Sequence, residues 1–213
     1  LGEKLIMEGD GVFTCRKDAH DLEHCLEVQI PFLQMVFKAV PQIVPIVIGT
    51  ERLSVLKRIA EVLEPYFKEG NLFIISSDFS HYPSYNDAKA SDLYLAETIT
   101  SGGLEDFLKA LSNISKRGYP GQGTAACGAS AIAVLLSMMD AQGRDQFTAE
   151  HLMYRNSGDS PYGEKDRVVG YNSIVFDGPE DDGHLFSFTE EEKVGMIAAA
   201  RSAIYSSLGL DYD

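Results

Sequence analysis

The 213-residue sequence has few basic side chains, no tryptophan and no long apolar run. Its 18 Lys and Arg residues stand against 32 Asp and Glu residues, which gives a net charge of −14. Nucleic acids and anionic membrane surfaces are bound through clustered Lys and Arg, so this balance disfavours both. No apolar stretch approaches the roughly 20 residues that a membrane-spanning helix needs. We therefore expect neither nucleic acid nor a membrane as a partner.

Cysteine is scarce as well. The three cysteines, Cys15, Cys25 and Cys127, are odd in number and widely spaced, which does not indicate a disulfide framework. Because the sequence also shows no signal peptide, we expect a cytoplasmic protein. P-loop, GxGxxG, HExxH and CxxC motifs are absent, which removes the most specific signs of nucleotide or zinc chemistry.

The apolar pattern predicts an α/β fold. The runs "IVPIVIGT" (43–50) and "NLFIISSD" (71–78) are typical of buried strands, and an amphipathic helix closed by Gly70 lies between them. A strand, a helix and a strand in this order predict a parallel pair with a right-handed crossover. Further helices are expected at 86–101, at 103–113 and within "GQGTAACGASAIAVLLSMM", a helix with Pro31 at a kink or a late start within 21–40, and strands near 147–156 and 167–176.

The composition changes after residue 176. We expect residues 1–176 to form the compact part and 177–187 to form an acidic linker. The last segment, 188–213, begins with Thr189 and Glu192 in the spacing of a capping box and continues with a helical period.

Two segments carry candidate reactive residues. In "SSDFSH", Asp78 and His81 follow a predicted parallel strand, at the edge where such sheets bind ligands. Alternatively, Asp78 or Ser80 caps a short helix and His81 lies at the surface. In "TAACGAS", Cys127 is expected near a helix N-terminus, which favours the thiolate that binds metals and attacks carbonyls. A small buried apolar role is the alternative.

A third segment, "DLEHCLE", contains Glu23, His24 and Glu27. His24 and Glu27 are three residues apart and would share one helical face. Their spacing allows a role in metal binding, and it equally allows an exposed acidic helix start.

Five blocks, "EHCLEVQIPFLQ", "IVPIVIGT", "FIISSDFSHY", "ACGASAIAVLL" and "VVGYNSIVF", together resemble the Memo family, protein B of the AmmeMemoRadiSam system. The tail "FSFTEEEKVGMIAAARSAIYSSLGL" is similar to the start of an AMMECR-type domain. The resemblance implies a mostly parallel sheet flanked by helices, related to the class III extradiol dioxygenases (LigB-like), with the N-terminal part of the Memo domain missing. It also implies radical SAM and AMMECR-type proteins as partners.

The resemblance also assigns roles to residues. It implies that Cys127 binds a redox-active metal, non-haem iron or copper, and that the two histidine ligands of the family lie upstream of this chain. Asp78 and His81 would be the catalytic residues of the pocket. His24 would line the pocket, and Glu23 would support it without touching the metal.

Three functions follow as hypotheses. The first is a metal-dependent, redox or dioxygenase-like enzyme built on Cys127, His81 and Asp78. The second is a hydrolase or transferase in which Cys127 is the nucleophile, activated by His81 and Asp78. The third is a non-catalytic module whose pocket binds a peptide or protein. Whether the chain is an enzyme therefore stays open at the level of the sequence.

Overall fold

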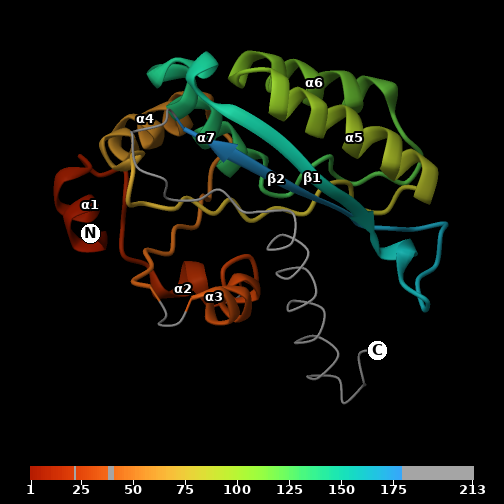
Figure 1. Ribbon diagram of the computed structural model, residues 1–213, viewed down its shortest axis with the longest axis horizontal. Helices are drawn as coiled ribbons and strands as arrows, with labels where there is room; N and C mark the ends of the chain where they lie inside the picture. The colour runs from red at the N-terminus through yellow and green to blue at the C-terminus, as the bar shows by residue number, and fades with distance from the viewer. Residues whose placement is uncertain (22, 38–40, 179–213) are drawn as a thin grey trace. The chain divides into compact units, whose positions relative to one another are not determined.

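The computed structural model of the protein describes residues 1–21, 23–37 and 41–178 (Figure 1). The chain divides into two compact units, and the described part of the first is 1–15 and 48–178. The described part of the second unit is 16–21, 23–37 and 41–47. The predicted linker beyond Gly178 and the helix predicted after Thr189 lie outside the described residues. None of the described helices has the length and hydropathy that crossing a membrane requires.

The helices beyond residue 50 agree largely with the sequence pattern, whereas the two within residues 1–20 were not predicted. In the first unit the helices are α1 (Gly2–Glu8), α4 (Leu53–Leu63), α5 (Tyr85–Ser101), α6 (Leu104–Arg117) and α7 (Ala129–Gln142). The second unit contains α2 (Lys17–His20) and α3 (Ile30–Val36). Pro31 lies in the first turn of α3, where its missing N–H costs no hydrogen bond, so the predicted late start is confirmed. Helix α4 ends before Gly70, which adopts a φ of +84° in the following turn.

Local signals explain where α5 and α6 begin and end. Ser84 caps α5 by accepting a hydrogen bond from the N–H of Asp87. Helix α6 has Glu105 and Asp106 in its first turn and Lys116 and Arg117 in its last, which complements the helix dipole. Gly118 then adopts the left-handed conformation that ends many helices.

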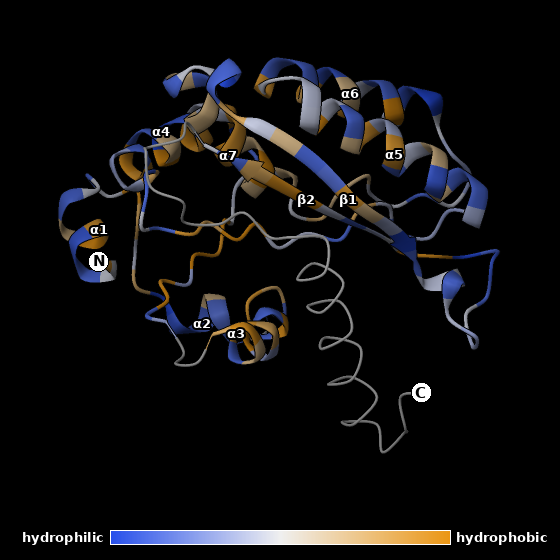
Figure 2. Ribbon diagram, in the orientation of Figure 1, coloured by the Kyte–Doolittle hydropathy of each residue, from blue (hydrophilic) through white to orange (hydrophobic). Residues whose placement is uncertain are grey.

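Helix α7 forms the centre of the first unit. Most of its residues are apolar, and those from Ile132 to Leu136 together with Met138 and Met139 are buried, as is typical of a core helix; the visible part of its ribbon is mostly hydrophobic in colour (Figure 2). Helices α4 and α6 both contact it. The largest side chains without exposed surface include Leu136, Met138 and Met139 of α7, Leu95 of α5 and Phe107 of α6.

Strands β1 (Thr148–Asn156) and β2 (Gly170–Asp177) form an antiparallel pair, close to the two strands predicted for this region. The register joins Thr148 to Asp177 and Asn156 to Gly170, with an irregularity between His151 and Met153. Helix α5 packs against both strands and α6 runs beside it (Figure 1).

The predicted parallel pair is not found. Neither 43–50 nor 71–78 is assigned to a strand, and the two-stranded antiparallel sheet is the sheet that the described residues form. Among the described residues, no backbone hydrogen bond joins 72–75 to another segment. Apolar and β-branched residues indicate that a segment suits a strand, but a strand also needs a neighbour for its N–H and C=O groups, and none is present here.

Candidate metal centre

The backbone from Phe79 to Tyr82 is held on two sides. On one side, the Phe79 N–H donates to the carbonyl of Gly170 at 2.8 Å and the Tyr82 N–H to that of Val168 at 2.7 Å. On the other, the His81 N–H donates to the carbonyl of Thr124 at 3.1 Å, and the His81 carbonyl accepts from the N–H of Gly123 at 2.8 Å. The loop before α7 and the start of β2 therefore fix the position of His81.

Cys127 lies directly before α7, beside Asp78. Its N–H donates to the carbonyl of Asp78 at 3.1 Å, and the N–H of Gly128 donates to Ser77 Oγ at 2.8 Å. A side chain at Gly128 would not fit, because its Cβ would lie 2.6 Å from Cβ of Ser77 and 2.8 Å from the carbonyl oxygen of Ser76. Glycine at this position allows the two segments to approach closely.

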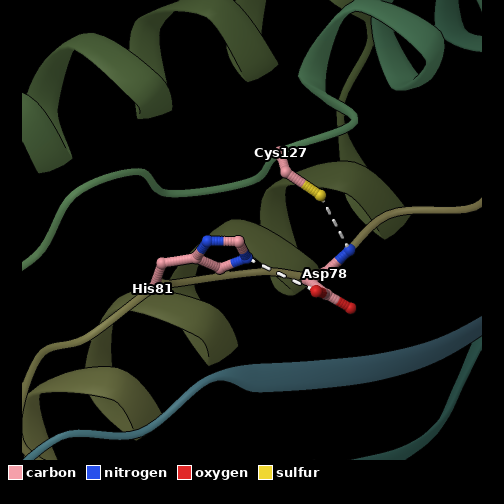
Figure 3. A group of neighbouring side chains, drawn as sticks. All are labelled: Asp78, His81 and Cys127. Atoms are coloured by element: carbon pink, nitrogen blue, oxygen red, sulfur yellow. Dashed lines mark hydrogen bonds and ion pairs between the residues drawn. The ribbon is translucent and has the colours of Figure 1, made fainter. Parts of the chain in front are cut away.

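This arrangement brings one donor atom each from Asp78, His81 and Cys127 within 4.8 Å of one another (Figure 3). We call these three residues the donor cluster. The N–H of Asp78 donates to the sulfur of Cys127 at 3.2 Å. Nε2 of His81 lies 3.4 Å from Oδ2 of Asp78. The imidazole and the thiol both point toward Asp78 from different segments (Figure 3).

The donor cluster fits a metal ion by two criteria. Nε2 of His81 is buried and has no hydrogen-bond partner among the described residues, although the whole side chain is 24% exposed. Ligands at about 2.0–2.3 Å from one metal are at most about 4.6 Å apart, so small side-chain shifts would let all three donors share an ion. A thiolate, an imidazole and a carboxylate suit iron, copper or zinc.

Two other predicted site residues belong to the second unit. His24 is exposed and lies outside the helices, so the predicted shared helical face is not found, although its Nδ1 lies 3.3 Å from Oε1 of Glu27. Glu23 is exposed and accepts a hydrogen bond from the thiol of Cys25 at 3.5 Å. Their proposed places in the pocket stay a prediction.

Two features beside His81 had no signal in the sequence. Tyr82 has a φ of 76°, a conformation that non-glycine residues adopt rarely and that often marks a functional segment. Its ring centroid lies 5.5 Å from that of His81 and 4.1 Å from the guanidinium carbon of Arg167. The chain direction at Tyr82 and the approach of Arg167 both depend on tertiary contacts, so spacing could not reveal them.

Comparison with known proteins places the chain in a family. Residues 1–175 match the family described as Memo-like protein. MEMO1 family proteins from Thermoplasma acidophilum and Aeropyrum pernix are each 33% identical to the chain, over 159 and 174 residues, and one from Nitrosopumilus maritimus is 34% identical over 159 residues. These alignments cover 75%, 80% and 74% of this chain but 54%, 58% and 54% of the relatives, so the chain spans about half of their length. The chain belongs to the Memo-like family.

Proposed function

We propose that the donor cluster is part of a site for a redox-active metal, non-haem iron or copper, in a redox or dioxygenase-like enzyme. The observation that carries this proposal is the buried Nε2 of His81: among the described residues it makes no hydrogen bond, its nearest charged neighbour is Oδ2 of Asp78 at 3.4 Å, and it lies within 4.8 Å of a thiol and a carboxylate. Buried polar atoms are rarely left unsatisfied, and a metal ion would satisfy this one.

Each member of the cluster has a distinct role in the proposal. Cys127 binds the metal through its sulfur, and His81 acts as a second ligand or as an acid/base group. Asp78 orients His81 or a bound water. When bound, the metal supplies redox chemistry that side chains alone lack. The resemblance to the family adds two histidine ligands from residues that this sequence does not contain.

Metal analysis of the purified protein at its complete natural length tests the proposal. We expect stoichiometric iron or copper in the wild type and a loss of most of it in Cys127→Ala. Cys15→Ala is the matched control, because Cys15 is also an exposed free cysteine of the first unit and is not part of the donor cluster. An unchanged metal content in Cys127→Ala would overturn the proposal.

Two further experiments on the same protein test the other hypotheses, a cysteine nucleophile and a non-catalytic binding module. An activity that survives chelators but is lost on alkylation of Cys127 by iodoacetamide would select the nucleophile mechanism. Partner binding that needs no metal and tolerates alanine at Asp78, His81 and Cys127 together would select a binding module. For such an experiment, radical SAM and AMMECR-type proteins are the partners that we propose, and the cytoplasm is the setting.

We also propose that 43–50 and 71–78 are strands of a mostly parallel sheet, related to that of class III extradiol dioxygenases, in the complete protein. Two observations support this. The chain spans about half of its relatives, so these segments can find partners in residues beyond this sequence. The side chains of Leu72 and Ile74 are 71% and 44% exposed, which is a high exposure for a run of apolar residues.

A further inference from the structure

Asp92 is a buried carboxylate that contacts the segment carrying Asp78 and His81. It lies on α5 and has no exposed surface, and the salt bridges among the described residues give it no Lys or Arg partner. A buried carboxylate costs free energy unless several donors compensate it. Asp92 therefore has to be explained by the groups that it contacts.

The contacts of Asp92 converge on Ser80. Oδ1 of Asp92 accepts from the N–H of Ser80 at 3.0 Å, and Oδ2 accepts from its hydroxyl at 3.0 Å. Tyr154 of β1 is a nearby hydroxyl that lowers the pKa of Asp92, and this hydroxyl accepts a hydrogen bond from Nδ2 of Asn156 at 3.1 Å. A carboxylate only accepts hydrogen bonds, so it can satisfy all these donors at once.

Ser80 is one of the two residues between Asp78 and His81 in the "SSDFSH" segment. It precedes His81 and lies two residues after Asp78, and it is completely buried. Its neighbour across the backbone is Gly170, where an added Cβ would lie 1.7 Å from Oδ2 of Asp92. The segment is thus fixed between α5 and β2 at Ser80, next to His81.

Ser91, which is adjacent to Asp92 on α5, supports the segment 78–81 from its opposite side. Ser91 accepts from Nε2 of Gln122 at 3.0 Å, and the same nitrogen donates to the carbonyl of Thr124 at 3.2 Å. Thr124 accepts from the N–H of His81. Two buried side chains of one helix therefore determine where His81 lies.

We propose that Asp92 is a positioning residue for the metal site: its bonds to Ser80 hold Asp78 and His81 at the spacing that lets them meet Cys127. This inference rests on the function proposed above for the donor cluster. Partners that orient metal ligands typically change metal affinity about 10-fold to 100-fold when they are replaced.

The test compares Asp92→Asn with Asp140→Asn in the protein at its complete natural length. Asp140 is a matched control, because its Oδ2 accepts from the N–H of Leu104 at 2.9 Å near the far end of α7, about 20 Å along the helix from Cys127. Co²⁺ serves as the probe, since coordination by a thiolate gives it a charge-transfer absorption.

We expect Asp92→Asn to weaken Co²⁺ binding about 10-fold or more and to alter the thiolate absorption. Asp140→Asn should leave the Co²⁺ affinity and the thiolate absorption unchanged, even if it lowers the thermal stability as much as Asp92→Asn does. Wild-type affinity and spectrum in Asp92→Asn would overturn the inference. Equal losses in both variants at equal thermal stability would also overturn it, because they would show a general effect of destabilisation.

A second readout needs no metal. Amide hydrogen exchange of the apoprotein reports how firmly the N–H groups of His81 and Cys127 are held by Thr124 and Asp78. We expect faster exchange at both in Asp92→Asn and no change at either in Asp140→Asn. Unchanged exchange in Asp92→Asn overturns the positioning role. If the wild-type protein binds no metal, the proposed function is refuted. In that case amide exchange in Asp92→Asn still decides whether Asp92 positions His81 and Cys127.

Discussion

Two adjacent parts of one segment, 72–75 and 78–81, differ in how their backbones are held. Within the described residues, 72–75 makes no backbone hydrogen bond to another segment, and its apolar Leu72 is 71% exposed. The segment 78–81 is bonded to the loop before α7, to the start of β2 and to Asp92. The apolar part has the stronger strand composition, yet the polar part has the fixed geometry. Neighbouring backbone and buried polar groups, more than hydropathy, determine order here.

The largest expected effect concerns Asp92, the buried side chain that is bonded to Ser80 in the segment 78–81. Burial raises the pKa of Asp92 from 3.8 to about 6, opposed by its hydrogen bonds from Ser80 and Tyr154 and by the nearby His81. A carboxyl group with a raised folded-state pKa stabilises the fold fully below about pH 4, and this contribution is lost as the pH rises through about 6. Burial also raises the pKa of Tyr154, so its hydroxyl keeps its proton and remains a donor across this range.

Asp92→Asn removes this titration. We expect the free energy of unfolding of the wild type, relative to that of Asp92→Asn, to fall by about 3 kcal/mol between pH 4 and pH 7, at about 1.4 kcal/mol for each pH unit between the two pKa values. Urea denaturation of both proteins across this range measures the difference. Parallel stability curves for the two proteins would show that the buried carboxyl group does not titrate in this way.

A somewhat smaller effect is expected at the close contact behind Ser80. In Gly170→Ala the new methyl group would lie 1.7 Å from Oδ2 of Asp92 and 3.3 Å from Oγ of Ser80, so the buried carboxylate has to move. We expect a loss of about 2 kcal/mol in the free energy of unfolding, typical of overpacking. Gly49→Ala is the control, because its Cβ would meet no atom within 4 Å. Equal stability of the two variants would contradict the close packing described for 78–81.

The smallest effect in this chain is expected at the exposed apolar part. Leu72→Ala should change the free energy of unfolding of the 213-residue chain by less than about 0.5 kcal/mol, since the side chain is largely exposed. Leu95→Ala, at a leucine with no exposed surface, should cost about 3 kcal/mol and serves as the reference.

The same pair of substitutions tests the proposed parallel sheet. If 71–78 is a buried strand in the complete protein, Leu72→Ala should there cost about 2 kcal/mol, as burial of a leucine side chain predicts. A cost that stays below about 0.5 kcal/mol at complete length would show that Leu72 remains exposed, which would count against the sheet.

Local signals in the sequence predicted the helices well. The helices expected at 86–101, at 103–113 and after the Gly-rich loop correspond to α5, α6 and α7. Caps, terminal charges and apolar spacing act over a few residues, so helices of this kind can be predicted from neighbours in the chain. The two strands near the C-terminal end of the compact part were predicted for the same reason. The parallel pair is not found among the described residues, because a strand depends on a partner that local composition does not specify.

The candidate site shows the same limit. Motif reading selected Asp78, His81 and Cys127 as chemically suitable, and the resemblance to the Memo family gave them roles. Neither the motifs nor the resemblance indicated Asp92, because it lies in an ordinary helical segment and its role follows only from its contact with Ser80.

The sequence by itself determined the helices, the acidic balance that disfavours nucleic acid, and the three reactive residue types, because each depends on composition or on neighbours in the chain. Only the tertiary structure decided that the sulfur of Cys127 meets the backbone of Asp78 49 residues earlier, and that Asp92 holds Ser80, one of the two residues between Asp78 and His81. Such contacts depend on close packing between distant segments, as at Gly128 and Gly170, and no local pattern encodes that geometry.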